Sequence, residues 1–221
     1  MESLVKTYIF IDLEATGLNR DQPKITELCM VAVHAISINN PVTDESGEVQ
    51  LPRVMDKLCL CVDPGKPLTK TASEITGLTN DLLTDCEKQT FDQNLFNTMS
   101  EFISRQAQPV CLVAHNGFFY DYPLLKTELL RQQLDLSESI LCLDSLQAFR
   151  NLQNQGQVHP ESGRKACSLT ELYRQLFSKD PNFAHYAEGD VLTLILVFIC
   201  KAEKLLQVAK YRRWGEIVPM Y

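Results

Sequence analysis

The segment Tyr8–Gly17, with the sequence YIFIDLEATG, constrains the fold more than any other part of the chain. Four hydrophobic or aromatic residues lead into Asp12 and Glu14, and Gly17 then breaks the run. Side chains alternate between the two faces of a β-strand, so Asp12 and Glu14 share one face while the intervening aliphatic residues share the other. The sequence therefore predicts a strand that buries one apolar face and carries two carboxylates near its end.

These two carboxylates have two interpretations. Adjacent carboxylates repel each other unless a cation lies between them, and oxygen-only ligands suit Mg²⁺ or Mn²⁺ rather than zinc. Alternatively, Asp12 and Glu14 are solvated acids at the end of a strand, because a short motif also matches by chance. Residues further along the chain distinguish between these two interpretations.

The pattern after this segment predicts a mixed sheet flanked by helices. Ile25–Ile38 and Val54–Val62 are expected to continue an antiparallel meander. Two short apolar segments, Val110–Ala114 and Ile140–Leu143, alternate with helical stretches further on. We therefore predict an α/β fold with a mixed central sheet of about five strands. The predicted helices cover Ser73–Leu78, Phe91–Arg105, Leu124–Leu134, residues 145–153, Ser168–Leu176 and residues 188–210.

Length, charge and cysteine content narrow the class of protein. A chain of 221 residues suits a single domain, expected to span residues 1–221. The net charge of −7 argues against a protein that coats nucleic acid through its overall field, but not against an enzyme built on a carboxylate cluster. None of the eight cysteines forms a C-x-x-C pair, so free thiols in a reducing compartment are expected.

The termini and apolar runs predict a soluble intracellular protein, in the cytoplasm, the nucleus or both. The N-terminal sequence MESLVKTYIF has no cleavable signal pattern. The longest apolar run, Val191–Cys200, is too short to span a bilayer.

Three polar residues late in the chain extend the first carboxylate pair. Asp121 follows a buried strand at the start of a helix, where it could also serve as an N-cap. Asp190 begins the last helix, where the helix dipole also favours an acid. On one continuous helix, His185 and Asp190 would point about 140° apart. We therefore expect Ala184–Gly189 to approach the helix irregularly, so that His185 can lie over the acid as a general base.

Two of the other histidines have simpler interpretations. His34 lies inside an apolar strand and is expected to be structural. His115 ends a buried strand in the sequence HNG, and it is expected to shape the site rather than to carry out chemistry.

In this order, the motifs resemble a known family. D-x-E near the N-terminus, H-N-G…Y-D at a strand–helix junction and H-x-x-x-x-D late in the chain are similar to the DEDDh 3′→5′ exonucleases. The finer resemblance is to the three-prime repair exonucleases, in their short form without a proline-rich insertion or a C-terminal membrane anchor. It covers Tyr8 to Tyr221 and is carried by the segments FIDLEATGL, ITEL, LPRVMDKL, ASEITGL, CLVAHNGFFYDYPLL, LCLDS and HYAEGDV.

The resemblance implies an RNase H-like exonuclease fold and a set of site residues. It implies that His185 is the base. It also implies that four carboxylates bind metal, those of Asp12, Glu14, Asp121 and Asp190. Four carboxylates neutralise two dications, so the implied cofactor is two Mg²⁺ per site, which Mn²⁺ can replace. Two such ions about 3.5–4 Å apart suit phosphodiester hydrolysis.

Substrate contacts are implied in the same way. Leu18 and Ile75 resemble apolar wedges that stack on the terminal bases, although core packing is the alternative for both. Tyr120 resembles a contact to the 3′ nucleotide or to the scissile phosphate, and the backbone near Glu14 and Ala15 is expected to meet the terminal 3′-OH. Arg164 and Lys165 resemble a basic loop that grips phosphates. Because apolar stacking tolerates any base, little base preference is expected.

The implied partners are single-stranded DNA or DNA 3′ ends and a second copy of the chain. Family members pair by extending their sheets edge to edge, and the segment 54–62 is the candidate edge, with Arg105 near the contact.

The leading function is a 3′→5′ DNA exonuclease that releases 5′-mononucleotides. The alternatives are an RNA 3′→5′ exonuclease of the oligoribonuclease or RNase T type and a non-catalytic module that binds single-stranded ends.

Overall fold

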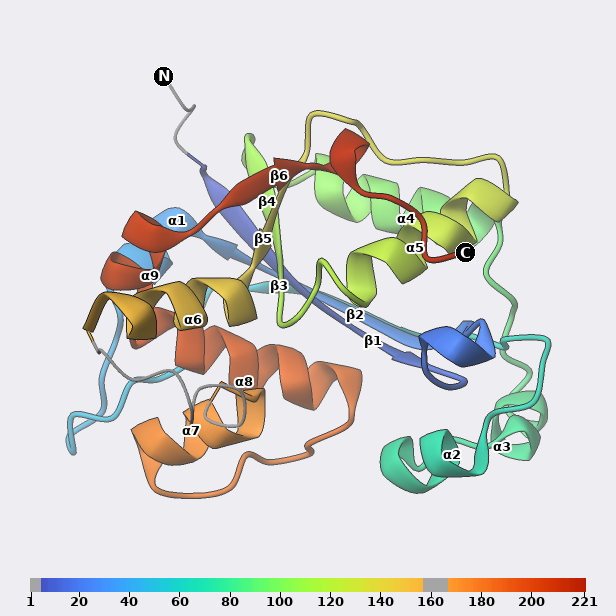
Figure 1. Ribbon diagram of the computed structural model, residues 1–221, viewed down its shortest axis with the longest axis horizontal. Helices are drawn as coiled ribbons and strands as arrows, with labels where there is room; N and C mark the ends of the chain where they lie inside the picture. Colours follow the sequence, from blue (N-terminus) through green and yellow to red (C-terminus); the bar gives the residue numbers. More distant parts are fainter. Residues whose placement is uncertain (1–4, 157–166) are drawn as a thin grey trace.

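The computed structural model describes residues 5–156 and 167–221 of the chain. Within these residues, a sheet of six strands forms the centre of the molecule (Figure 1). In chain order the strands are β1 (Thr7–Ala15), β2 (Ile25–His34), β3 (Asp56–Cys61), β4 (Val110–Ala114), β5 (Leu141–Asp144) and β6 (Tyr211–Arg213).

The sheet is mixed, as the sequence predicts. Its strand order is β3-β2-β1-β4-β5-β6. The meander β1–β2–β3 is antiparallel, β1, β4 and β5 run parallel, and β6 pairs antiparallel with β5. β6 was not predicted, because three residues with two exposed arginines carry no apolar pattern.

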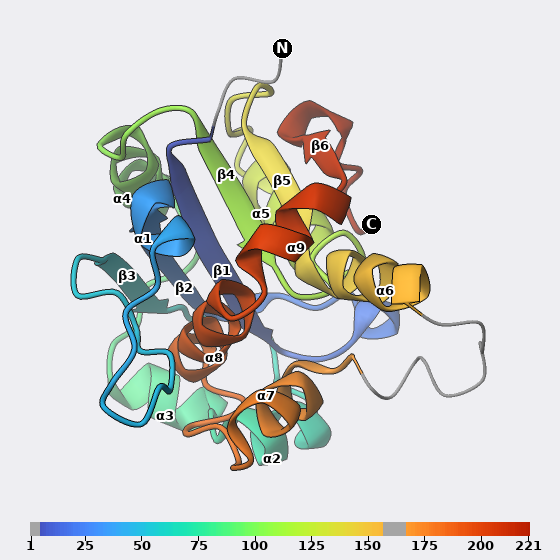
Figure 2. The same cartoon turned by 90° about the vertical axis from the view of Figure 1, so that its left-hand side faces the viewer.

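Helices cover both faces of this sheet. They are α1 (Ala35–Asn39), α2 (Lys70–Thr76), α3 (Asn80–Asp85), α4 (Gln93–Ser104), α5 (Asp121–Arg131), α6 (Ser145–Gly156), α7 (Leu169–Phe177), α8 (Ala187–Ile199) and α9 (Ala202–Val208). In Figure 2 the helices α6 to α9 lie in front of the sheet, and α4 and α5 lie behind it. Short 3-10 turns, η1 (Asn19–Asp21) and η2 (Trp214–Glu216), complete the structure.

The alternation along β1 divides the core in two. Ile9, Ile11 and Leu13 pack with α4 and α5, whereas Tyr8 and Phe10 pack with the layer that contains α8. The predicted apolar face of β1 is therefore confirmed. Because side chains alternate along a strand, the carboxylates of this strand face the α8 layer.

Two predicted elements are shorter than expected. The segment Ile25–Ile38 is not one strand: β2 ends at His34, whose Nδ1 accepts a hydrogen bond of 3.2 Å from the backbone N–H of Ile36 and so caps α1. The predicted helix at 188–210 is two helices, α8 and α9, since Lys201 between them lacks helical backbone angles. The helix α3 was missed, although Thr79 caps it through a 3.1 Å bond from Leu82 N–H.

Two connections place the site at the carboxyl end of β1. The backbone N–H of Thr69, just before α2, donates to the carbonyl of Thr16 at 2.8 Å, so α2 begins beside the end of β1. The parallel neighbour β4 leads through the turn at residues 115–120 into α5. In the part of the chain that is described, no helix has the length and apolar character needed to cross a membrane.

Candidate active site

A pocket of about 520 Å³ opens beyond the carboxyl end of β1. This is the edge of an α/β sheet where ligands bind, outside the carboxyl ends of the parallel strands. The pocket collects every predicted site residue that the structure describes: Asp12, Glu14, Ala15, Leu18, Ile75, Tyr120, Asp121, His185 and Asp190. The remaining two, Arg164 and Lys165, lie outside the described residues.

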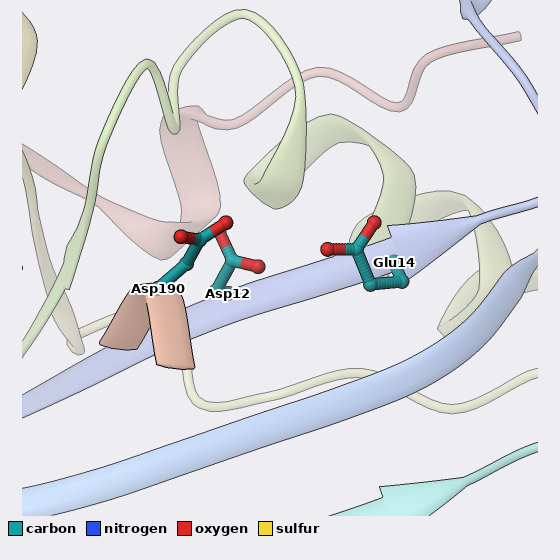
Figure 3. Close-up of side chains that lie close together, drawn as sticks. All are labelled: Asp12, Glu14 and Asp190. Carbon is teal, nitrogen blue, oxygen red and sulfur yellow. The ribbon is translucent and has the colours of Figure 1, made fainter. Parts of the chain in front are cut away.

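Three carboxylates converge at one side of this pocket. Asp12 and Glu14 project from one face of β1, and Asp190 projects toward them from the first turn of α8 (Figure 3). Each of the three offers an oxygen within 4.8 Å of the others. The interpretation of Asp12 and Glu14 as two solvated acids at a strand end is therefore replaced by a cluster that a divalent cation can occupy.

Asp121 supplies the fourth carboxylate from the first residue of α5, where it is buried. The N-cap of α5 is Tyr120, and no side-chain cap is formed, so the alternative role of Asp121 as a cap is wrong. Its charge acts on Asp12, whose pKa it helps to raise.

The electrostatics of the cluster are unfavourable in the absence of a cation. Burial, with the negative charges of Asp190, Glu27 and Asp121, raises the pKa of Glu14 to about 8. Burial and the charge of Asp144 raise the pKa of Asp121 to about 7. Burial also raises the pKa of Asp12 well above its usual value. Among the residues described, no salt bridge reaches the four carboxylates.

A buried acid on β5 fixes the turn that leads to Asp121. The Asp144 carboxylate accepts hydrogen bonds of 3.1 Å from the backbone N–H groups of Asn116 and of Phe118. Gly117 lies at the close approach between this turn and β4, because a Cβ there would lie 2.5 Å from the Cβ of Ala114. Asp144 was not predicted, although the sequence LCLDS places it directly after a buried strand.

His115 is held inside this turn. Its Nδ1 lies 2.9 Å from the Ser145 hydroxyl and its Nε2 lies 2.9 Å from the Cys167 carbonyl, which only an N–H can satisfy. Burial lowers the pKa of His115 to about 4, so the ring is neutral near pH 7. The geometry agrees with the prediction that His115 shapes the site.

His185 lies outside the helix that carries Asp190, as the spacing predicts. α8 begins at Ala187 with Tyr186 as its N-cap, so His185 belongs to the preceding loop. Its backbone is in the left-handed region with φ 66, and its N–H donates to Asp190 Oδ2 at 3.1 Å. The exposed imidazole therefore stands beside the acid cluster.

Two residues that sequence reasoning missed hold this loop and helix. A Cβ on Gly189 would lie 2.1 Å from the carbonyl oxygen of Phe183, so only glycine lets the loop pack on the first turn of α8. Glu27 Oε2 accepts a 3.1 Å hydrogen bond from the N–H of Ala187, and Glu27 is the cross-strand partner of Glu14. Neither contact can be read from local sequence, because both join distant segments.

The predicted substrate contacts lie around the rim of the pocket. The side chains of Leu18 and Ile75 are 61% and 49% exposed, so core packing is wrong for both. The Tyr120 hydroxyl donates a 2.5 Å hydrogen bond to the Gly17 carbonyl and so ties α5 to the turn that carries Leu18. These side chains leave an apolar rim above a polar floor.

Comparisons with known proteins agree with this geometry. The family model described as exonuclease matches residues 9–198. Three prime repair exonuclease 2 of Homo sapiens is 48% identical over 219 residues, which cover 98% of this chain and 93% of that protein. Three-prime repair exonuclease 1 of Homo sapiens is 43% identical over 223 residues, covering 98% and 71%.

Solved structures share the fold. The nuclease domain of 3′hExo, a DEDDh family member bound to rAMP, superposes with a TM-score of 0.66 at 16% identity, covering 92% of this chain and 94% of that one. E. coli Exonuclease I in complex with an oligonucleotide gives a TM-score of 0.63 at 16% identity, covering 91% and 42%. The architecture is therefore the RNase H-like fold of DEDDh exonuclease domains.

Proposed function

This chain belongs to the exonuclease family, and within it to the three prime repair exonucleases, and on that premise we propose that it releases 5′-mononucleotides from the 3′ ends of DNA. The observation that carries the proposal is the cluster of carboxylates beside the exposed His185, in a pocket with an apolar rim. Such a cluster repels phosphate unless cations are bound, so it suits a metal-dependent phosphodiester hydrolase better than a simple end-binding module.

The donor set fits divalent metal ions. It consists of oxygen donors alone, and burial together with the neighbouring carboxylates raises the pKa values of Asp12, Glu14 and Asp121. We propose that two Mg²⁺, which Mn²⁺ can replace, are held by Asp12, Glu14, Asp121 and Asp190. When bound, the ions would neutralise these carboxylates and stabilise the charge that develops on the phosphate and on the leaving oxygen.

His185 is proposed as the general base that accepts a proton from the attacking water. An imidazole ring carries a nitrogen lone pair that can accept a proton, and histidine commonly acts as a general base. In the described part of the chain, no hydrogen bond occupies the imidazole, while its backbone N–H is fixed by Asp190. The ring is therefore held at the cluster and remains free to accept a proton.

The rim is proposed to bind the substrate strand. Leu18 and Ile75 present exposed aliphatic surface on which terminal bases can stack, and stacking of this kind tolerates any base. The backbone at Glu14 and Ala15 is proposed to meet the terminal 3′-OH, and Tyr120 to contact the 3′ nucleotide or the scissile phosphate. Arg164 and Lys165 are proposed to contact phosphates, although they lie outside the described residues.

A second copy of the chain is proposed as a partner through the edge of the sheet. Among the strands of the described residues, β3 pairs with β2 alone, so its other side presents backbone groups that can pair with another strand. The neighbourhood of Arg105 lies next to this edge, since Gln106 Nε2 donates to Asp56 Oδ2 at 3.1 Å.

Organisation and location follow from the same features. We propose that residues 1–221 form one domain, because the two helical layers pack on a single sheet. Residence in the cytoplasm, the nucleus or both is proposed because all eight thiols are free, as in reducing compartments.

The proposal is tested by comparing the wild-type protein with His185→Ala, and with His34→Ala as a matched control away from the site. With Mg²⁺ we expect the wild type and His34→Ala to degrade DNA alike, whereas His185→Ala loses about 10²- to 10⁴-fold in kcat and still binds Mn²⁺. EDTA should abolish every activity. Unchanged turnover in His185→Ala would refute its role, and preference for RNA oligonucleotides would place the chain among RNA exonucleases.

A further inference from the structure

Two aromatic side chains flank His185 on the loop between α7 and α8, and nothing in the proposed chemistry uses them. Phe183 is 73% exposed and Tyr186 is 52% exposed. Their ring centroids are 5.9 Å apart with an interplanar angle of 83°, an edge-to-face pair. His185 therefore lies, in sequence, between two residues whose rings contact each other and are exposed to solvent.

The backbone holds these rings outward at a cost. Phe183 has φ 54 and His185 has φ 66, so both lie in the left-handed region, which a bulky residue such as Phe rarely adopts. Such conformations persist only where the surroundings fix them, and they gather at functional sites.

Three contacts fix this loop. Tyr186 N–H donates to the Phe183 carbonyl at 3.1 Å, and His185 N–H donates to Asp190 Oδ2. The Phe183 carbonyl also packs where a Cβ on Gly189 would stand. The exposure of the rings therefore comes from a defined conformation rather than from a loose loop.

The pair reaches toward the far rim of the pocket. The hydroxyl of Tyr186 lies 4.0 Å from the place that a Cβ on Gly77 would take, directly after α2. α2 carries Ile75, which lines the pocket together with His185. In Figures 1 and 2 the orange loop before α8 lies next to α2. The pair therefore lies next to the pocket rather than in its lining, and Tyr186 reaches the side of the rim that carries Ile75.

We propose that Phe183 and Tyr186 form a stacking platform for bases of the substrate strand that lie upstream of the scissile phosphate. The inference rests on the proposed function and extends it from the terminal nucleotide to the strand outside the pocket. Single-stranded nucleic acid is the occupant that fits, because its bases offer flat π-faces to exposed rings, and the platform is continuous with the site that receives the 3′ end. It adds affinity for the strand without selecting a base.

The platform is tested with substrates of different length. Phe183→Ala and Tyr186→Ala are compared with Phe183→Tyr, which keeps the ring. A further control is Val218→Ala, which alters a residue of the C-terminal segment that is as exposed as Phe183. KM and kcat are measured on oligothymidylate of about ten nucleotides and on a nitrophenyl ester of thymidine 5′-monophosphate, which has no upstream base.

We expect each alanine variant to raise KM for the oligonucleotide by about fivefold or more, with kcat little changed. On the nitrophenyl ester the same variants should match the wild type, and Phe183→Tyr and Val218→Ala should match it on both substrates. An equal loss on both substrates would show that the rings only support the His185 loop, and this would overturn the proposal. An unchanged KM on the oligonucleotide would overturn it as well.

Binding measured without turnover separates this inference from the proposed function. Fluorescence anisotropy of the labelled oligonucleotide is recorded in Ca²⁺ for the same variants. If the wild type binds the oligonucleotide in Ca²⁺ but does not cleave it in Mg²⁺, the proposed hydrolase activity fails. Weaker binding by Phe183→Ala would still support the platform in that case. If the wild type cleaves and all variants bind equally, the platform alone fails. If the wild type does not bind at all, both fail.

Discussion

Replacing Gly189 with alanine tests how His185, the proposed general base, is positioned. A glycine inside a helix is normally replaced by alanine with a gain of about 0.5–1 kcal/mol in stability. Here the new methyl group would lie 2.1 Å from the carbonyl oxygen of Phe183 and 2.8 Å from its carbonyl carbon. The loop that carries His185 must therefore move away from α8.

The size of the effect follows from that distance. A carbon–oxygen contact needs roughly 1 Å more than the available space. Because His185 is two residues from Phe183, we expect its ring to shift by a comparable amount. A displacement of about 1 Å from the productive geometry costs about 10²-fold in rate.

The assay is steady-state release of mononucleotides in Mg²⁺, together with circular dichroism and Mn²⁺ binding. Gly189→Ala should lose about 10²-fold in kcat, while secondary structure and metal binding remain. Gly215→Ala is the matched control, because the three atoms nearest to a Cβ there all belong to the side chain of Glu138, the first at 3.1 Å. Wild-type kcat in Gly189→Ala would refute the inference that the loop packing positions His185.

Three further predictions concern the acid cluster and the rim. Folding raises the pKa of Glu14 to about 8 and that of Asp121 to about 7. The free energy of unfolding of the metal-free protein should therefore fall between about pH 4 and pH 8, by on the order of 1 kcal/mol per pH unit. Urea unfolding in saturating Mg²⁺ should lack this slope. Asp121→Asn should raise the metal-free Tm by several degrees, because one buried charge is removed, and should weaken the rise in Tm that Mg²⁺ produces; a lower metal-free Tm would contradict the repulsion. Tyr120→Phe removes the hydrogen bond to the Gly17 carbonyl, which is worth about 1 kcal/mol. The turn that carries Leu18 should then be held less firmly, and KM should rise about fivefold. An unchanged KM would show that this hydrogen bond does not position the rim.

The sequence predicted the parts of the site that depend on local periodicity. The period of two along β1 placed Asp12 and Glu14 on one face, and the structure confirms both their common direction and the buried opposite face. Side chains five residues apart on one helix would not converge, which predicted an irregular approach between His185 and Asp190, and α8 begins between them.

The parts that were missed depend on contacts between distant segments. Glu27 caps α8 from across the sheet, and Asp144 fixes the turn before Asp121 from the neighbouring strand. The sequence around each of these acids does not predict which backbone N–H donates a hydrogen bond to it. The same limit applies to β6, which exists because β5 offers it a pairing edge rather than because its own residues favour a strand.

The sequence pattern also did not predict which aliphatic side chains are exposed. Leu18 and Ile75 had core packing as an alternative, and an aliphatic residue alone cannot distinguish a core position from a rim. Only the turn after β1 and the placement of α2 beside it turn both residues outward.

The identity of the first product tests the central claim most directly. A DNA strand labelled at its 3′ end, and the same strand labelled at its 5′ end, are incubated with the wild-type protein and Mg²⁺, and the products are separated. The carboxylate site predicts that the 3′ label is released first, as a 5′-mononucleotide, while the 5′-labelled strand shortens by one nucleotide at a time. Release from the 5′ end, internal cuts or a product with a 3′-phosphate would contradict this assignment.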